Sequence, residues 1–177
     1  MMPFTRPLPP ENFVAAAAVM AVAAILGALV LQHGLGYIPC KLCLEQRTPY
    51  YYGIPLLCSA FALFFFFKAP PRMTAALCLA AAALFAYGAY LGVRHAGVEW
   101  RWWEGPGDCG MTSFGENYDA ASLLEQIQKT RVVSCTDAAL RILGLSLAGW
   151  NAVVASCAGL LAAKAGLTAW RGTGPKD

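Results

Sequence analysis

Charged residues are clustered along this chain and leave four long stretches that carry no charge. These stretches are residues 12–40, 48–67, 73–93 and 142–163. A helix needs roughly 20 mostly apolar residues to cross the hydrocarbon core of a bilayer, and each stretch reaches that length. The pattern predicts four membrane-spanning helices, at about residues 13–35, 49–67, 73–93 and 142–163. The connections at about 36–48 and 94–141 then lie on the side opposite the two termini.

The composition agrees with a membrane protein. The chain has 177 residues, of which 58% are hydrophobic and 13% charged, whereas about a quarter of the residues in a soluble domain are charged. We expect a single integral membrane domain over residues 1–177, folded as an all-α bundle of four transmembrane helices. The first apolar run continues from Phe13 to Leu35. A cleaved signal peptide has a core of roughly 7 to 15 residues, so we expect this run to stay in the membrane.

The distribution of basic residues favours one orientation of the bundle. The side of the termini carries six basic residues against two acidic ones, Glu11 and Asp177; the basic ones are Arg6, Lys68, Arg72, Lys164, Arg171 and Lys176. The other side carries seven basic and eight acidic residues, so a count of Lys and Arg alone does not decide the orientation. The short basic hairpin at 68–72 and the basic tail favour cytoplasmic termini. The net charge of +3 gives no reason to expect nucleic acid as a partner.

The first connection contains a C-x-x-C motif, formed by Cys40 and Cys43. A disulfide across this spacing closes a small ring, stiffens the fold little and exchanges readily, so the motif usually serves redox chemistry or metal binding. A structural zinc needs four Cys or His ligands, and the sequence has no second closely spaced pair. We therefore expect redox chemistry and no metal.

The long connection contains two more cysteines, Cys109 and Cys135. If this side of the membrane is oxidising, as a bacterial periplasm is, the four cysteines of the two connections can form two disulfides. The three remaining cysteines lie inside the expected spans, where we interpret them as small apolar fillers; they are Cys58, Cys78 and Cys157.

Two further segments give structural expectations. Residues 119–133 place Leu123, Leu124 and Ile127 on one side, as in a short amphipathic helix that lies on the membrane or packs on the core of its own loop. Asn151 falls inside the fourth apolar stretch, where an amide usually hydrogen-bonds a neighbouring helix.

These features together resemble the disulfide bond formation protein B family of bacterial inner-membrane thiol:quinone oxidoreductases. The resemblance covers four spans, a C-x-x-C followed by Arg47, the two cysteines of the long connection, and the sequence 144–150, Gly-Leu-Ser-Leu-Ala-Gly-Trp, at the start of the last span. The four-cysteine layout is its specific part, since a C-x-x-C alone is weak evidence.

The resemblance implies a role for each matching residue. Cys109 would form the mixed disulfide with a reduced periplasmic thioredoxin-fold oxidase, and Cys109 and Cys135 would form the pair that this partner attacks. Electrons would then reach the Cys40/Cys43 pair through a transient bridge from Cys40 to Cys135. The thiolate of Cys43 would contact the quinone, either ubiquinone or menaquinone.

Two more residues are implied to bind the quinone, Arg47 beside the ring and His95 at the end of the third span. The local sequence around His95, residues 93–97, departs from the family pattern. On physical grounds, the start of a helix and the cations Lys41 and Arg47 would favour a thiolate at Cys43. Arg47 could also stabilise negative charge on a quinone oxygen, or only anchor its helix at the lipid headgroups.

Two other functions fit parts of the pattern. A thiol oxidase of the vitamin K epoxide reductase type is also a small helical bundle with a C-x-x-C, although that motif lies late in its chain. A non-enzymatic four-span scaffold would have loop disulfides that are structural and resist mild reductant.

Overall fold

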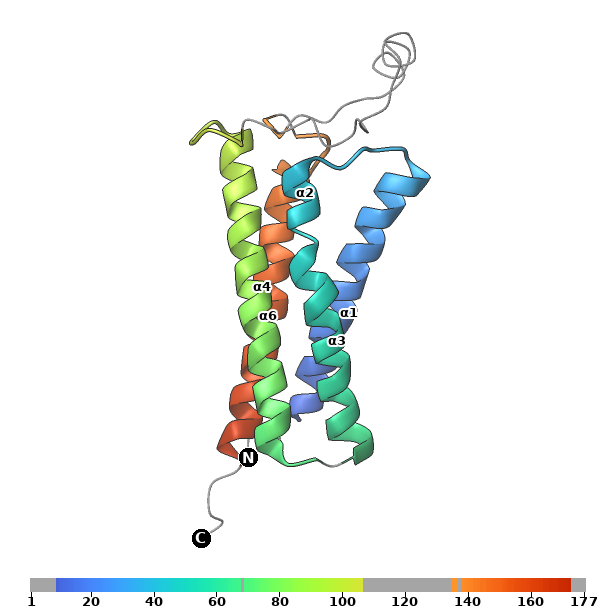
Figure 1. Ribbon diagram of the computed structural model, residues 1–177, viewed down its shortest axis with the longest axis vertical. Helices are drawn as coiled ribbons and strands as arrows, with labels where there is room; N and C mark the ends of the chain where they lie inside the picture. The colour runs from blue at the N-terminus through green and yellow to red at the C-terminus, as the bar shows by residue number, and fades with distance from the viewer. Residues whose placement is uncertain (1–8, 68, 107–134, 137, 173–177) are drawn as a thin grey trace, which may run out of the picture.

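The computed structural model describes residues 9–67, 69–106, 135–136 and 138–172. The described part is a bundle of long helices (Figure 1). Its helical segments are α1 (Pro10–Leu29) with the π-helical turn η1 (Val30–Gly34), α2 (Lys41–Glu45), α3 (Thr48–Ala62) with the π-helical turn η2 (Leu63–Phe67), α4 (Pro71–Glu99) and α6 (Leu147–Arg171). Four segments are long and apolar enough to cross a membrane, namely Pro10–Gly34, Lys41–Phe67, Pro71–Glu99 and Leu147–Arg171. The predicted four-helix membrane bundle is confirmed.

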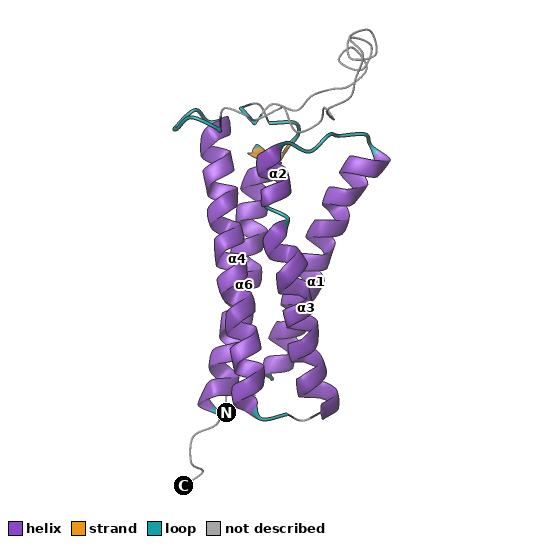
Figure 2. Ribbon diagram, in the orientation of Figure 1, coloured by secondary structure: helices purple, strands orange, loops and turns teal. Residues whose placement is uncertain are grey.

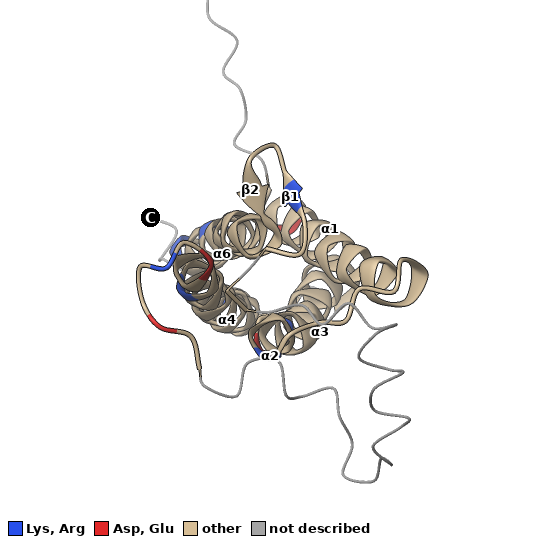
Figure 3. Cartoon of the chain, turned by 90° about the horizontal axis from the view of Figure 1, so that it is seen from above, with Lys and Arg blue, Asp and Glu red and all other residues tan. Residues whose placement is uncertain are grey.

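The helices alternate in direction, so α1 begins and α6 ends at the same end of the bundle (Figures 1 and 2). The other end carries α2 and a short antiparallel hairpin made of β1 (Arg141–Ile142) and β2 (Leu145–Ser146). Seen from that end, the hairpin lies beside α1 and α6, and α2 lies at the start of α3 (Figure 3). Segments far apart in the sequence are therefore gathered at one end of the molecule.

Small side chains allow the helices to approach closely, as is common within bilayers. A Cβ added to Gly92 of α4 would lie 2.7 Å from the backbone nitrogen of Ala152 in α6, so this contact tolerates only glycine. Larger groups, Tyr50 and Phe85, fill the space between α3 and α4, with ring centroids 5.4 Å apart. The close packing fixes the height of α4 relative to its neighbours.

Asn151 makes the interhelical contacts that the sequence predicts. Its Oδ1 accepts a hydrogen bond from the hydroxyl of Tyr50 at 2.8 Å, and its Nδ2 donates to the carbonyl oxygen of Gly88 at 3.4 Å. One amide thereby joins α3, α4 and α6 near the end of the bundle that carries α2.

The third long helix continues beyond its expected end. We expected the span to stop near Val93, but α4 runs to Glu99. A helix of 29 residues is about 43 Å long, which exceeds the roughly 30 Å of a hydrocarbon core. Its last turns carry His95 and Glu99, which places both residues near one edge of the bundle rather than in a loop.

The last helix starts later than expected. Residues 142–146 belong to the hairpin that starts at Arg141, and α6 begins at Leu147 and continues to Arg171. The turn between the strands needs positive φ angles, 52° at Leu143 and 83° at Gly144, which a helix does not contain. Ser146 then caps α6 by accepting a hydrogen bond from the backbone N–H of Gly149 at 3.2 Å. The amphipathic segment expected at 119–133 lies outside the described residues.

Candidate functional site

The C-x-x-C motif forms the first turn of α2. Cys40 is the N-cap residue, and its sulfur accepts a hydrogen bond from the backbone N–H of Cys43 at 3.2 Å. The two sulfurs are 2.7 Å apart and both thiols are free. Hydrogen bonding to Cys43 and burial both raise the pKa of the Cys40 thiol. The raised pKa favours the protonated form of Cys40 in the reduced pair.

The second cysteine-bearing connection reaches the same place. Cys135 is buried and disulfide-bonded, and it packs with Cys40, Leu42 and Val98 in one apolar cluster that Cys43 also contacts. Its pairing with Cys109 stays a prediction, because Cys109 lies outside the described residues. The long loop thus brings a disulfide sulfur next to the C-x-x-C.

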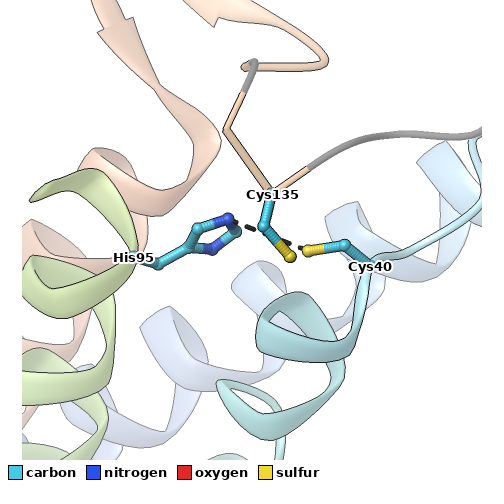
Figure 4. Close-up of side chains that lie close together, drawn as sticks. All are labelled: Cys40, His95 and Cys135. Carbon is cyan, nitrogen blue, oxygen red and sulfur yellow. Dashed lines mark hydrogen bonds between the residues drawn. The ribbon is translucent and has the colours of Figure 1, made fainter. Parts of the chain in front are cut away.

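Figure 4 shows Cys40, His95 and Cys135 pointing toward one another from three different parts of the chain. The two sulfurs and a ring nitrogen of the histidine all lie within 4.8 Å of one another. Such groups are also transition-metal ligands. The sulfur of Cys135 is already bonded in a disulfide, however, so this arrangement suits thiol–disulfide exchange between Cys135 and Cys40.

His95 is held between two segments of the site. Its Nε2 lies 3.8 Å from the sulfur of Cys40 and its Nδ1 lies 2.6 Å from Nε2 of Gln46. The same Gln46 nitrogen donates to the carbonyl oxygen of Leu42 at 3.3 Å. The histidine is 4% exposed, so it is an internal part of the site rather than a loop residue. Sequence reasoning named His95 and missed Gln46.

Arg47 stands at the N-cap of α3, where its Nη1 donates a hydrogen bond to Oε1 of Gln32 near the end of α1. This contact holds the guanidinium at the wall of a cavity rather than extended toward solvent. The side chain of Cys43 lines the same cavity.

The cavity has a volume of about 500 Å³ and lies between the upper parts of α1, α3, α4 and α6. Most of its wall is apolar, including Ala24 and Ala28 of α1, Leu31 of η1 and Val154 of α6. One end is polar and is formed by Cys43, Gln46, Arg47, His95 and Glu99. An apolar space of this size with a few polar groups at one end fits a flat, lipid-soluble ring that bears carbonyl oxygens.

Glu99 is a further residue that sequence reasoning missed. Its side chain is 5% exposed, its Oε1 lies 3.9 Å from Nε2 of His95, and its Oε2 has no hydrogen-bond partner among the described residues. The one available signal was its position four residues after His95, which puts both side chains on one face of α4.

The cysteines of the spans are only partly as expected. Cys78 is buried in the core of the bundle, but Cys58 and Cys157 are exposed on helix surfaces. The prediction that all three fill the core was wrong for these two, because a small apolar side chain is equally compatible with a face that meets lipid.

Comparison with protein-family models gives one match. The model described as disulfide bond formation protein DsbB matches residues 10–165. No curated protein matches the chain, and no solved structure does either.

Proposed function

This chain belongs to the DsbB family of disulfide bond formation proteins, and from that premise we propose that it oxidises a periplasmic dithiol protein and passes the electrons to a membrane quinone. Family membership makes it a multi-pass membrane thiol oxidoreductase that acts in disulfide formation. The observation that carries the rest is the meeting of Cys135 with Cys40 beside a cavity that Cys43 lines.

We infer that electrons enter at the long connection. A thiolate of a reduced thioredoxin-fold partner attacks Cys109 of a Cys109–Cys135 disulfide and releases the thiolate of Cys135. Cys135 then attacks the sulfur of Cys40 in the oxidised C-x-x-C, and Cys43 leaves as a thiolate. The second thiol of the partner displaces Cys109, and Cys109 attacks Cys135, which reforms the Cys109–Cys135 disulfide and releases Cys40. The contact between Cys40 and Cys135 supports this order, because attack on Cys40 makes Cys43 the leaving group.

The polar end of the cavity suits the second half of the reaction. When bound, a quinone accepts two electrons and two protons and becomes a quinol. Cys43 presents its sulfur to the cavity, and Arg47 presents a permanent positive charge that stabilises negative charge on a quinone oxygen. The hydrogen bond to Gln32 keeps that charge at the cavity wall.

Thermodynamics requires an acceptor of this kind. A disulfide that oxidises a strongly oxidising partner must be regenerated by something still more oxidising, and 30 mV in a two-electron couple corresponds to about 1.4 kcal/mol. Ubiquinone and menaquinone are lipid-soluble quinones, which suits the mostly apolar cavity, and we propose one of them as the acceptor. In this scheme the termini are cytoplasmic and both cysteine-bearing connections are periplasmic.

A spectroscopic experiment tests this function. Purified protein loaded with quinone and reduced at its cysteines should show a visible charge-transfer absorption between the thiolate of Cys43 and the ring. Cys43→Ser should abolish this absorption and quinone reduction. Cys157→Ser, which changes an exposed cysteine of α6 that does not line the cavity, is the matched control and should leave both unchanged.

Two results would count against the proposal. An absorption that persists in Cys43→Ser would assign the thiolate to another residue. If the wild-type protein neither binds nor reduces quinone, the result would favour the non-enzymatic four-span scaffold, whose disulfides are structural and do not exchange. The vitamin K epoxide reductase type loses support from the family match itself.

A further inference from the structure

Glu99 is a buried carboxyl group at the cavity wall for which the electron route above gives no role. Its Oε2 has no partner among the described residues, while the hydroxyl of Ser146 hydrogen-bonds the carboxyl group. A buried polar oxygen without a hydrogen-bond partner destabilises the fold, so the unpaired oxygen of Glu99 suggests a functional role for this side chain. The group is also close enough to Cys43 for their charges to interact.

His95 cannot serve as the base of this site in the observed arrangement. The carbonyl oxygen of Leu42 can only accept, so the Gln46 atom facing it is the NH₂ group, which also faces Nδ1 of His95. Nδ1 must then accept, and the proton of the ring sits on Nε2. His95 consequently donates toward the sulfur of Cys40 and has no free lone pair for a thiol proton.

We propose that Glu99 is the proton carrier of this site, taking up a proton when Cys43 becomes a thiolate and delivering it to a quinone oxygen as the disulfide reforms. This inference rests on the proposed function. Cys43 and the buried Glu99 line the same cavity, where two negative charges would be unfavourable, so formation of the Cys43 thiolate would be accompanied by protonation of Glu99. The unpaired Oε2 provides the place for that proton.

The step balances in protons and electrons. In the reduced site Cys40 is a thiol, Cys43 a thiolate and Glu99 a carboxylic acid. The S–H bond of Cys40 breaks, the bond between Cys40 and Cys43 forms, and two electrons leave through Cys43 to the quinone. Glu99 supplies one proton and Cys40 the other, which gives the quinol and a Glu99 carboxylate. Reduction of the C-x-x-C by two thiols then restores both protons.

The groups that face Glu99 come from several elements. Arg141 of β1 is near enough to interact electrostatically with Glu99, and Ser146 of β2 hydrogen-bonds its carboxyl group. His95 lies on the same helix, and Arg47 shares the cavity wall. Arg141 and Arg47 are both permanently charged, so neither competes for the proton that passes between sulfur and carboxyl.

An infrared difference experiment tests the carrier without any quinone. Spectra of the quinone-free protein are recorded with the C-x-x-C reduced and oxidised, and a carboxylic acid C=O band should appear on reduction. Glu99→Gln, which keeps the size of the side chain, should remove this band. Glu104→Gln, at an exposed position, is the matched control and should keep it. Glu99→Asp retains a carboxyl on the same turn and should retain a band at a shifted frequency.

Kinetics of the quinone-loaded protein supply the second readout. Glu99→Gln should lower kcat for quinone reduction about a hundredfold, within the usual range for general acid–base groups, with little change in KM for quinone. A reduction-dependent carboxyl band that survives in Glu99→Gln, or its absence from wild type, would overturn the inference. Failure of wild type to reduce quinone would instead refute the proposed function, since the infrared result does not depend on it.

Discussion

At the scale of single residues, Gln46 determines which nitrogen of His95 carries the proton. Replacing Gln46 by Glu exchanges a donor for an acceptor at nearly constant volume, so Nδ1 of His95 should become protonated. The chain has only two histidines, which makes ¹⁵N-histidine NMR a direct measurement. Wild type should show a bare Nδ1 and a protonated Nε2 at His95, and Gln46→Glu should show a protonated Nδ1.

Glu45→Gln is the control for this prediction, because it changes a charge beside Gln46 without touching the histidine bond. It should give the wild-type imidazole signals. If Gln46→Glu also gave them, the hydrogen bond from the amide would not determine the tautomer. His95 could then have a free lone pair on Nε2 and act as a base.

The residues of the site could be predicted only where spacing or resemblance singled them out. Cys40, Cys43 and Arg47 lie within eight positions, and their chemistry can be read from the sequence. Gln46 and Glu99 look like ordinary polar residues at helix ends, and nothing in the sequence says that one histidine lies between them. Their role arises from the contact of α2 with the end of α4, which is a tertiary feature.

At the scale of secondary structure elements, the contact between α4 and α6 sets the position of His95 and Glu99. Gly92 lies one turn before His95, and a methyl group there would meet the backbone of Ala152. Gly92→Ala should therefore destabilise the bundle by about 1–3 kcal/mol, the usual cost of overpacking. In detergent-solubilised protein this corresponds to a fall in unfolding temperature of roughly 2–12 °C.

Gly27→Ala is the matched substitution, since a methyl group at Gly27 of α1 would meet nothing within 4 Å. Its unfolding temperature should stay the same or rise slightly, because alanine favours a helix over glycine. Equal stability of both variants would show that α4 and α6 can separate without cost. The close approach would then be irrelevant to the geometry of the site.

The spans themselves follow from length and charge, because a bilayer excludes charged residues over a fixed thickness. The residues at which the spans end cannot be predicted from length and charge. A helix in a bilayer can continue past the hydrocarbon edge, as α4 does to Glu99, and the apolar residues of 142–146 instead make a hairpin whose turn depends on Leu143 and Gly144. Hydropathy does not predict these outcomes, because the extension of α4 contains the charged residues Arg94 and Glu99 and is still helical, whereas the mostly apolar hairpin is not.

Across the whole bundle, the redox groups lie at one end, and the start of α1 and the end of α6 lie at the other (Figure 1). The sequence predicted that all four loop cysteines share one side of the membrane. It did not predict, outside the family resemblance, that Cys135 would pack against Cys40, because that contact depends on the path of the long connection. The topology of the bundle therefore places all candidate exchange partners of Cys135 at one end. Side-chain packing then determines that Cys135 contacts Cys40.

The orientation of the bundle in the membrane can be predicted from its chemistry as well as from its basic residues. Disulfides of the kind that Cys135 forms persist in an oxidising compartment, so this end of the bundle should face the periplasm. Alkaline phosphatase is active only where its own disulfides form. A fusion after Gly105, at the redox end, should be active, whereas fusions after Pro70 and after Asp177 should be inactive. The reverse pattern would place Cys40 and Cys135 in a reducing compartment, where no net dithiol oxidation could be sustained, and the membrane orientation and the proposed electron route would both be wrong.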